Sequence, residues 1–178
     1  MRARSDGRTA GVSIENNKEL FMQKELIILD EDKVWMRRRI AELEKQIQNL
    51  GPEFYEVFNQ SSETWHDNAP FDALRDRQSV LDAELQSLRR ALRNSAVSVP
   101  KPPKGKVGIG STVRLSDGKI YFIAGDYTPH AGQLKDGALV ISRNTPLAAE
   151  LIGRKIGDMV AIGRAKSLIE AIDVNGRL

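Results

Sequence analysis

The stretch Ser61-Ser62-Glu63-Thr64-Trp65-His66-Asp67-Asn68-Ala69-Pro70-Phe71 lies between two long segments with helical hydrophobic periodicity. It contains helix-capping residues, a proline and aromatic side chains. Residues of these types are favoured where a chain reverses and a new helix begins. We therefore predict a helical hairpin whose tip spans residues 59–70.

Apolar residues recur on both sides of this tip with alternating steps of four and three. This spacing is the heptad a/d pattern of a coiled coil. The sequence therefore predicts an antiparallel coiled-coil hairpin over residues 17–94. A compact helical bundle is the alternative, but it needs further helices that the sequence does not supply. The positions of the pattern are Met36, Ile40, Leu43, Ile47, Leu50 and Phe54 on the first arm, and Leu74, Gln78, Leu81, Leu85, Leu88 and Leu92 on the second.

The ends of the two arms carry helix-start signals. Asp30-Glu31-Asp32 places acids where the positive end of the helix dipole favours them, and Pro70 suits a first helical turn. Gly51-Pro52 interrupts the first arm, so we expect a kink or a junction between two helices there. Arms of about 25–30 residues reach roughly 40 Å at 1.5 Å per residue.

Composition limits the classes of function. The 178 residues include no cysteine and two histidines, which excludes disulfides, thiolate chemistry and Cys–His zinc sites. The formal net charge is only +3, whereas a duplex-binding protein more often has a one-signed stripe. We expect a cytoplasmic protein with no membrane partner, because no apolar run approaches ~20 residues and no signal peptide is recognisable. We also expect a monomer, with a disordered leader at residues 1–16.

After a Pro/Lys-rich linker at residues 95–106, whose lysines we interpret as solubilising, the hydrophobic period changes to two. Asp117-Gly118 is a hairpin-turn signal, and Asn144-Thr145-Pro146 opens a short helix with Leu147, Leu151 and Ile152 facing inward. The sequence predicts a small α+β domain at residues 107–178, an antiparallel sheet crossed by one short helix. The expected strands are 111–115, 120–124, 138–142, 159–162 and 166–174.

The run Ile141–Asp158, ISRNTPLAAELIGRKIGD, resembles the C-terminal motif of the Gre transcript cleavage factors of bacterial RNA polymerase. That family has a Ser-Pro-Leu-type helix start, then Leu-Leu/Ile-Gly-Lys and a Gly-Asp turn. The second arm is also similar to the family, which has a Glu-Asn-Ala-x-Tyr run followed by Arg and Gln. The resemblance covers about residues 30–176. The matching positions are Thr145-Pro146-Leu147, Leu151-Ile152-Gly153, Gly157-Asp158, Asp67-Asn68-Ala69-Pro70-Phe71, Arg75 and Gln78.

The resemblance implies an FKBP-like C-terminal domain that docks on the rim of the polymerase secondary channel while the hairpin enters the channel. The tip would meet the 3′ end of the nascent RNA. Two acidic tip residues would help to hold Mg²⁺ in the polymerase active site, so that the polymerase cuts its own backtracked RNA. The chain itself would then be an accessory factor without a cofactor of its own. Carboxylates are suitable Mg²⁺ ligands, and the reaction is metal-assisted phosphodiester hydrolysis.

The tip departs from the family pattern, which is Asp-Leu-Lys-Glu-Asn-Ala. The matching stretch here is Thr64-Trp65-His66-Asp67-Asn68-Ala69. Asp67 occupies the second acidic position, either as the metal-positioning catalytic acid or as a helix cap. Thr64 is a neutral hydroxyl in place of the first acid, and Glu63 beside it is either a substitute ligand or a solvated carboxylate. The alternative function is a Gre-like factor that binds the channel and regulates or inhibits polymerase without cleavage.

Two further groups of residues are candidate contacts. Arg75 and Arg77 follow the tip and either contact RNA phosphates or form surface ion pairs with Asp72 or Asp76. Asn144-Thr145-Pro146 is a helix cap by its sequence. The resemblance also places it at the polymerase-contacting edge, as a partner-binding site.

Two other classes of function remain open from the sequence. A prolyl isomerase needs an aromatic-lined pocket, but the C-terminal domain has only Tyr121, Phe122 and Tyr127, and the first two point to opposite faces of a strand. A coiled-coil adaptor for an unrelated partner fits the hairpin equally well, but it does not account for the C-terminal motif.

Overall fold

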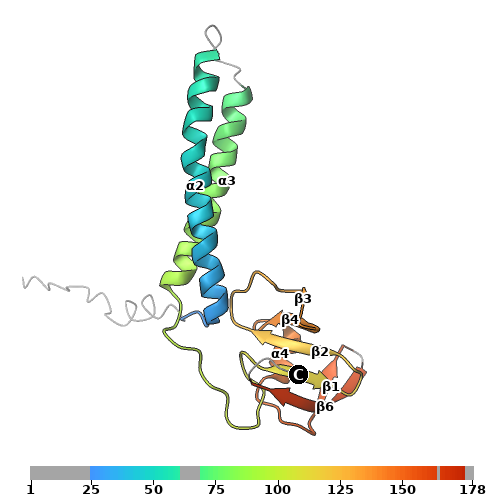
Figure 1. The fold of residues 1–178 in the computed structure, drawn as a ribbon. Coiled ribbons are helices and arrows are strands. Elements are labelled where there is room, and N and C mark those ends of the chain that lie inside the picture. Colours follow the sequence, from blue (N-terminus) through green and yellow to red (C-terminus); the bar gives the residue numbers. More distant parts are fainter. Residues whose placement is uncertain (1–24, 61–68, 164, 175–178) are drawn as a thin grey trace, which may run out of the picture.

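The computed structural model describes residues 25–60, 69–163 and 165–174. A long helical hairpin projects from a small sheet domain (Figure 1). Its arms are α2, Asp30–Gln60, and α3, Ala69–Arg93. The predicted architecture of a coiled-coil hairpin followed by a sheet domain with one short helix is confirmed, and it fits the FKBP-like domain that the resemblance implies. Within the described ranges, none of the helices has the length and apolar character of a membrane span.

Helix α2 begins and continues as its sequence directs, with one exception. Asp30, Glu31 and Asp32 form its first turn, as predicted. Pro52 lies inside the helix, which is continuous from Asp30 to Gln60. The expected junction at Gly51-Pro52 is therefore not present. The missing N–H of Pro52 leaves the carbonyl of Gln48 without its helical donor, and the pairing with α3 on the same stretch keeps the helix intact.

The heptad positions form the contact between α2 and α3. Met36, Leu43 and Leu50 are at most 1% exposed, and Leu85 and Leu88 of α3 are buried in one cluster with Met36 and Leu43. Burying one such side chain contributes about 1.5–3 kcal/mol relative to leaving it exposed. The apolar contact between the arms therefore holds the hairpin together.

Ion pairs flank this contact and join the arms. Arg39 binds Glu84 through two hydrogen bonds, from Nε to Oε1 at 2.7 Å and from Nη2 to Oε2 at 2.9 Å. The pair raises the pKa of Arg39 and lowers the pKa of Glu84, mainly through this hydrogen bonding. Arg89 bonds Glu44 in the same way from α3 to α2. These opposite charges lie at facing positions on the two helices and favour the observed alignment of the arms.

The sheet has six strands in the order β3-β4-β2-β1-β6-β5. Its pairs are antiparallel except β2 with β4, which is parallel, so the wholly antiparallel sheet predicted from the sequence is wrong in this detail. A parallel pair needs a crossover of a dozen or more residues, and residues 125–137 supply it. The strands are β1 Thr112–Leu115, β2 Ile120–Ala124, β3 Leu134–Lys135, β4 Ala138–Ser142, β5 Met159–Ile162 and β6 Ala165–Asp173.

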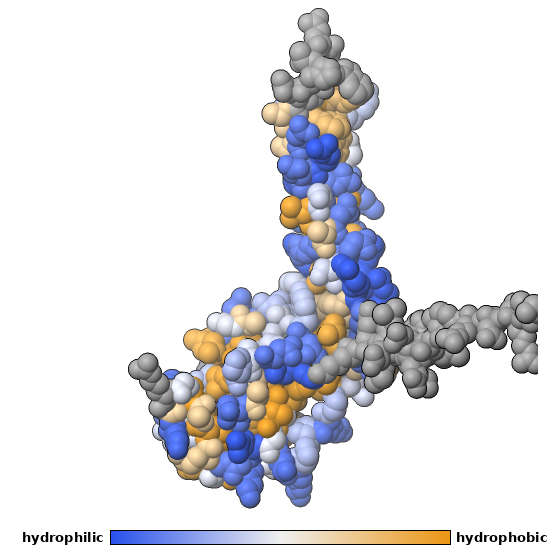
Figure 2. Space-filling model, turned by 180° about the vertical axis from the view of Figure 1, so that it is seen from behind, coloured by the Kyte–Doolittle hydropathy of each residue, from blue (hydrophilic) through white to orange (hydrophobic). Residues whose placement is uncertain are grey.

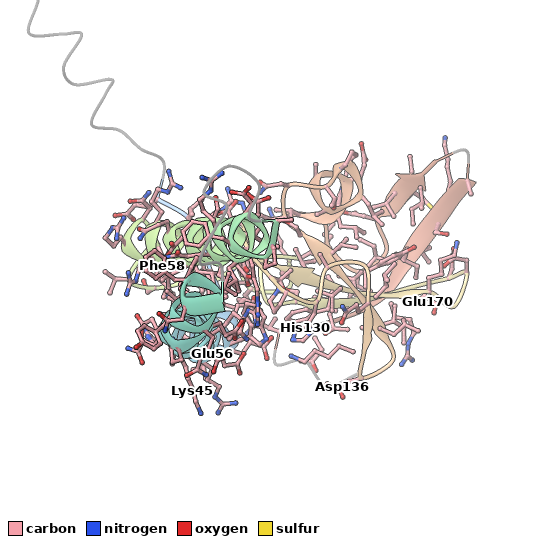
Figure 3. The ribbon with its side chains drawn as sticks, turned by 90° about the horizontal axis from the view of Figure 1, so that it is seen from above. Lys45, Glu56, Phe58, His130, Asp136 and Glu170 are labelled. Carbon is pink, nitrogen blue, oxygen red and sulfur yellow. The ribbon has the colours of Figure 1, made fainter. Side chains whose placement is uncertain are left out.

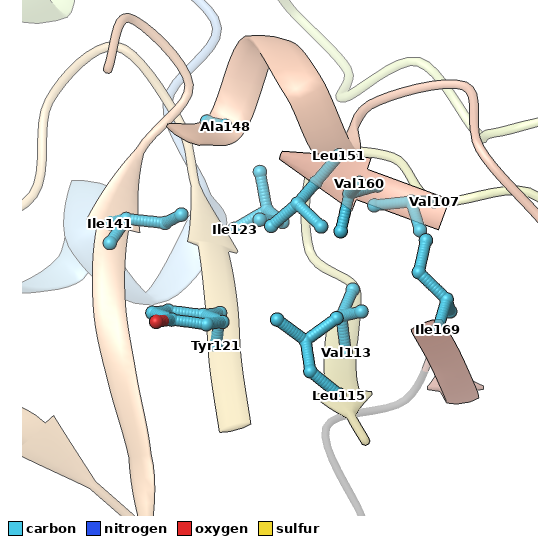
Figure 4. Packing of buried hydrophobic residues seen from close by; sticks show 10 residues of the cluster. All are labelled: Val107, Val113, Leu115, Tyr121, Ile123, Ile141, Ala148, Leu151, Val160 and Ile169. Carbon is cyan, nitrogen blue, oxygen red and sulfur yellow. The ribbon is translucent and has the colours of Figure 1, made fainter. Parts of the chain in front are cut away.

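The core of this domain lies between the sheet and α4, Pro146–Leu151 (Figure 4). Ala148 and Leu151 point from the helix onto Ile123, Val160 and other strand residues, and all are fully buried or nearly so. Leu147 packs partly against the same cluster. Ile152 was expected to face inward but is 39% exposed, because the helix has ended there and Ile152 is its C-cap.

The short segment before α2 joins the hairpin to the rest of the molecule. Leu26 donates from its N–H to the Asn94 carbonyl at 2.8 Å, and Ala96 returns a bond to the Leu26 carbonyl at 2.8 Å. On its other side, Ile27 donates to Asp126 Oδ2 at 2.7 Å and accepts from the Asp126 N–H at 2.6 Å. The segment is thus bonded both to the end of α3 and to the sheet domain.

The contact with the sheet domain is close enough to require glycine. A Cβ on Gly125 would lie 2.1 Å from the Ile27 carbonyl oxygen and 3.2 Å from the Ile28 Cα. Arg143 also forms an ion pair with Asp126 at 3.3 Å, which orients the carboxylate that receives the Ile27 N–H. Trp35 of α2 and Tyr127 pack beside this contact with ring centroids 6.4 Å apart.

We predict that Gly125→Ala destabilises the protein by about 1–3 kcal/mol, the usual effect of forcing a group into filled space. The added methyl group would press on backbone atoms that cannot move without breaking the Ile27–Asp126 bonds. Urea denaturation followed by circular dichroism measures the effect.

Gly51→Ala is the matched control. Gly51 lies within α2 and has nothing within 4 Å of an added Cβ. Alanine there should stabilise the helix by about 0.5–1 kcal/mol. Equal stability of the Gly125→Ala variant and the wild type would contradict the steric role of Gly125.

Candidate functional site

The tip residues on which the catalytic prediction rests lie outside the described residues. Glu63, Thr64 and Asp67 all fall in the range 61–68. The described part of the hairpin ends at Gln60 and resumes at Ala69. The roles predicted for Glu63 and Asp67 therefore stay predictions.

The last described turns beneath the tip are joined across the two arms. The rings of Phe54 and Phe71 meet edge to face with centroids 5.3 Å apart. One turn further down, Arg77 donates from Nη1 to Glu53 Oε2 at 3.2 Å. An aromatic pair of this geometry contributes about 0.5–1.5 kcal/mol beyond its buried area. The two arms are thus held together up to the first turn of α3.

Both arginines that were candidates for RNA contact have carboxylate partners. Arg75 lies 3.4 Å from Asp72 on the same helix, and both side chains are exposed. Arg77 pairs with Glu53 of the opposite arm instead of Asp76. Exposed pairs of this kind contribute at most about 1 kcal/mol, so a phosphate could displace either partner at small cost.

The described residues contain no group of three or more His, Cys, Asp or Glu side chains that could hold a metal ion. The metal role predicted for Asp67 lies outside the described residues and stays a prediction.

The second predicted site, at the start of α4, is a well-formed helix cap. Thr145 has extended φ and ψ of −77° and 147°, and its Oγ1 accepts from the Ala148 N–H at 3.2 Å. Pro146 follows at the first helical position. Asn144 and Pro146 are exposed, while Thr145 is half-buried and donates to the Ser142 carbonyl at 2.9 Å. A partner would therefore meet Asn144 and Pro146, while Thr145 shapes the turn between them.

The sequence analysis did not foresee a buried acid at the base of the hairpin. Asp32 is 2% exposed; its Oδ1 accepts from Thr128 Oγ1 at 3.1 Å, and its Oδ2 has no partner. Burial raises the pKa of Asp32 above its ordinary value of 3.8, and the Thr128 hydrogen bond opposes this only in part. The acidic run Asp30-Glu31-Asp32 did not reveal which carboxylate the sheet domain covers.

A cavity of about 420 Å³ opens beside this base, between the start of α2 and the sheet. Leu29, Phe122 and Ala138 form apolar parts of its wall, and Glu31 and Lys135 close one side through an ion pair at 2.6 Å. The cavity is at the opposite end of the hairpin from the tip.

Comparisons with known proteins identify the family. No family model matches the chain. "Transcription elongation factor GreA" of Nitratiruptor sp. is 37% identical over 112 residues, 58% of this chain and 64% of that protein. GreA of Haemophilus influenzae is 34% identical over 118 residues, 61% of this chain and 72% of that protein. The chain belongs to the GreA family of transcription elongation factors.

The similarity to GreA proteins covers only part of the length of those proteins. The chain spans 60–64% of the first relatives that it matches. The crystal structure of GreA factor homolog 1 (Gfh1) of Thermus thermophilus covers 84% of this chain at 18% identity, with a TM-score of 0.39. That structural similarity is too low to transfer detail from one protein to the other.

In this GreA-family chain, the C-terminal motif builds one local structure. Thr145-Pro146-Leu147 begins α4, and Gly153 follows its end with φ of +85°. Gly157 has φ of +90°, and Asp158 closes the next turn by accepting the Lys155 N–H at 3.0 Å. The motif that carried the resemblance thus specifies the cap, the end of the helix and the turn into β5.

The raised pKa of Asp32 yields a prediction on stability. Because its folded pKa is raised, ionisation of Asp32 destabilises the fold as pH rises through that pKa, and the penalty is absent below the ordinary value of 3.8. Asp32→Asn keeps an oxygen acceptor for Thr128 and removes the buried charge. We expect this variant to be more stable than the wild type at neutral pH, with a gain that shrinks as pH falls toward 3.8.

Denaturant unfolding at several pH values tests this expectation. Asp30→Asn is the matched control, since it removes an exposed carboxylate from the same helical turn and reports the loss of a favourable dipole contact, about 0.3–1 kcal/mol, together with an exposed ion pair to Lys33. A loss of stability in Asp32→Asn at neutral pH as large as that in the control would refute the penalty assigned to burial.

Proposed function

We propose that this GreA-family chain is a transcription elongation factor that binds RNA polymerase and inserts its hairpin into the secondary channel. It acts there on backtracked complexes by stimulating cleavage of the nascent RNA. The polymerase active site carries out the cleavage, and the chain is an accessory factor. The observation that carries the proposal is a narrow, joined two-helix projection on a separate domain, in a chain of this family.

The dimensions of the hairpin support insertion into a narrow passage. The 31 residues of α2 give a rod of about 45 Å at 1.5 Å per residue. The view along the hairpin shows the sheet domain to one side of its axis, with Lys45 and Glu56 on the rod (Figure 3). The rod surface is largely hydrophilic (Figure 2). A two-helix rod with polar side chains along its surface suits a narrow, water-filled channel.

The proposal includes Mg²⁺ because the tip contains carboxylate side chains. Asp67, with Glu63 as the candidate second acid, offers carboxylate oxygens, which are the ligand type that Mg²⁺ prefers. In the polymerase active site, bound Mg²⁺ would stabilise the charge that develops during phosphodiester hydrolysis. The contribution of this chain is to bring one or two carboxylates, on a stiff support, to a metal that the polymerase already holds.

One feature of the sequence favours a second candidate function. Thr64 stands where the resemblance predicts an acid, and a neutral hydroxyl is a poor Mg²⁺ ligand. A factor with a single tip carboxylate would still occupy the channel and so regulate or inhibit polymerase without cleavage. Both functions require the same binding mode, and they differ only in what the tip does to the RNA.

Cleavage of RNA in stalled, backtracked elongation complexes decides between these functions. We expect added protein to release 3′-terminal RNA fragments, Asp67→Ala to abolish that release, and Thr64→Asp to increase it about tenfold or more by restoring a second carboxylate. Asp76→Asn, an exposed acid on α3 below the tip, is the matched control and should behave as the wild type.

Two outcomes would count against cleavage stimulation. Either the wild type releases no fragments although it binds the polymerase, which selects the non-cleaving regulator, or Asp67→Ala releases as much RNA as the wild type. Failure to bind polymerase at all would refute both functions.

The start of α4 provides a separate prediction on binding. Asn144→Ala and Pro146→Ala together should weaken association with polymerase about tenfold, because both exposed side chains lie on the edge that the resemblance assigns to the partner. Thermal stability should change little, since Thr145 still caps the helix. Ala149→Ser, exposed on the same helix, is the control. Unchanged affinity of the double variant would place the docking surface elsewhere.

A further inference from the structure

Two lysines at the end of the linker and one in the turn after α4 form no side-chain ion pair within the described residues, and their backbones are held by hydrogen bonds. Lys104, Lys106 and Lys155 are exposed, and no ion pair to any of them is formed within the described parts of the chain. By contrast, the neighbouring Arg154 is balanced by Glu150 at 3.8 Å. The question is why cations gather here in a chain whose overall charge is only +3.

A tight turn fixes the first two lysines. The Lys106 N–H donates to the Pro103 carbonyl at 3.0 Å, and Gly105 at the third position of the turn has φ of +74°. This is the type II pattern, in which glycine supplies the positive φ. Pro102 packs directly on Gly108, where an added Cβ would lie 2.4 Å from the Pro102 Cβ. This part of the linker is therefore a built structure.

Backbone pairing then brings the third lysine beside them. Val107 donates to the Arg154 carbonyl at 2.8 Å, and Gly153 donates to the Val107 carbonyl at 2.9 Å. This pairing makes Lys106 and Lys155 direct partners in an antiparallel bridge. Like charges directly opposite each other across such a bridge destabilise it. A bound polyanion would compensate the repulsion between Lys106 and Lys155.

We propose that Lys104, Lys106 and Lys155 form a binding surface for the phosphate backbone of duplex DNA. Lysine ammonium groups act as point charges for phosphates, and contacts of this kind position a protein without reading sequence. The surface contains no aromatic side chain on which unpaired bases could stack, which separates it from a single-strand site. Lysine is depleted at protein interfaces, so three lysines favour a nucleic acid over a protein partner.

The location of this surface makes it independent of the tip. The linker runs from the end of α3 down beside the sheet domain, away from the hairpin tip (Figure 1). A duplex held there would not compete with anything bound at residues 59–70. The inference therefore goes beyond the proposed function and does not rely on polymerase binding.

Fluorescence anisotropy with a labelled DNA duplex of arbitrary sequence, in the absence of polymerase, tests the proposal. Three phosphate contacts predict a slope of log K against log salt near −2.7, or a loss of roughly 40-fold in affinity between about 50 and 200 mM salt. The variant Lys104→Gln/Lys106→Gln/Lys155→Gln should bind at least about tenfold more weakly at about 50 mM salt, with a slope shallower by roughly two to three.

A second variant controls for net charge. Arg37→Gln/Arg38→Gln/Lys45→Gln removes three exposed cations from the hairpin and changes the net charge by the same amount. It should retain the affinity and the salt slope of the wild type. Circular dichroism confirms that both variants stay folded.

Three results would overturn the proposal. The linker variant binds duplex DNA as the wild type does, or the hairpin variant loses as much affinity, or the same label on single-stranded DNA binds more tightly than the duplex. Loss of polymerase binding by the linker variant with unchanged duplex affinity would identify a protein contact instead. Because the DNA assay contains no polymerase, its outcome is independent of the proposed function.

Discussion

The close contact between Ile27 and Gly125-Asp126 sets the direction of the whole hairpin. The base of the hairpin meets the sheet domain where Ile27 donates to the Asp126 carboxylate at 2.7 Å and accepts from the Asp126 N–H at 2.6 Å. A rod of about 45 Å magnifies any change at its base, so a rotation of about 10° would move the tip by about 8 Å. Side-chain contacts such as Trp35 with Tyr127 would tolerate such a rotation more easily than a paired backbone with no space for a Cβ.

The chain before α2 therefore has two functions in the fold. Leu26 extends the hairpin by pairing with the end of α3, and Ile27, one residue later, pairs with the sheet domain. Adjacent residues of a strand-like segment present their hydrogen-bonding groups to opposite sides. One short segment can thus tie both arms of the hairpin and the sheet domain together. The buried Asp32 is covered by this arrangement, and its unpartnered oxygen is a cost that the surrounding contacts offset.

Features governed by local chemistry were predictable from the sequence, and features governed by distant contacts were not. The heptad spacing predicted both arms of the hairpin. The Asp117-Gly118 turn predicted β1 and β2, and Thr145-Pro146 predicted the start of α4. The parallel pairing of β2 with β4, the short β3 and the Gly125 contact depend on where residues 125–137 run in space, which no local pattern encodes. At the tip, the sequence supplied residue types for a metal site, while the described residues fix only the support beneath it.

The separation of support from tip has a consequence for function in this family. The described contact between the arms and the junction at Ile27 are built from residues on the helices and at the base of the hairpin. Substitutions such as threonine for an acid at position 64 can therefore change what the tip does without changing how it is delivered. The converse also holds, because a change at Gly125 would misdirect an intact tip. Under the proposed function, a cleaving factor and a channel regulator would share this scaffold and would differ in the residues of the tip.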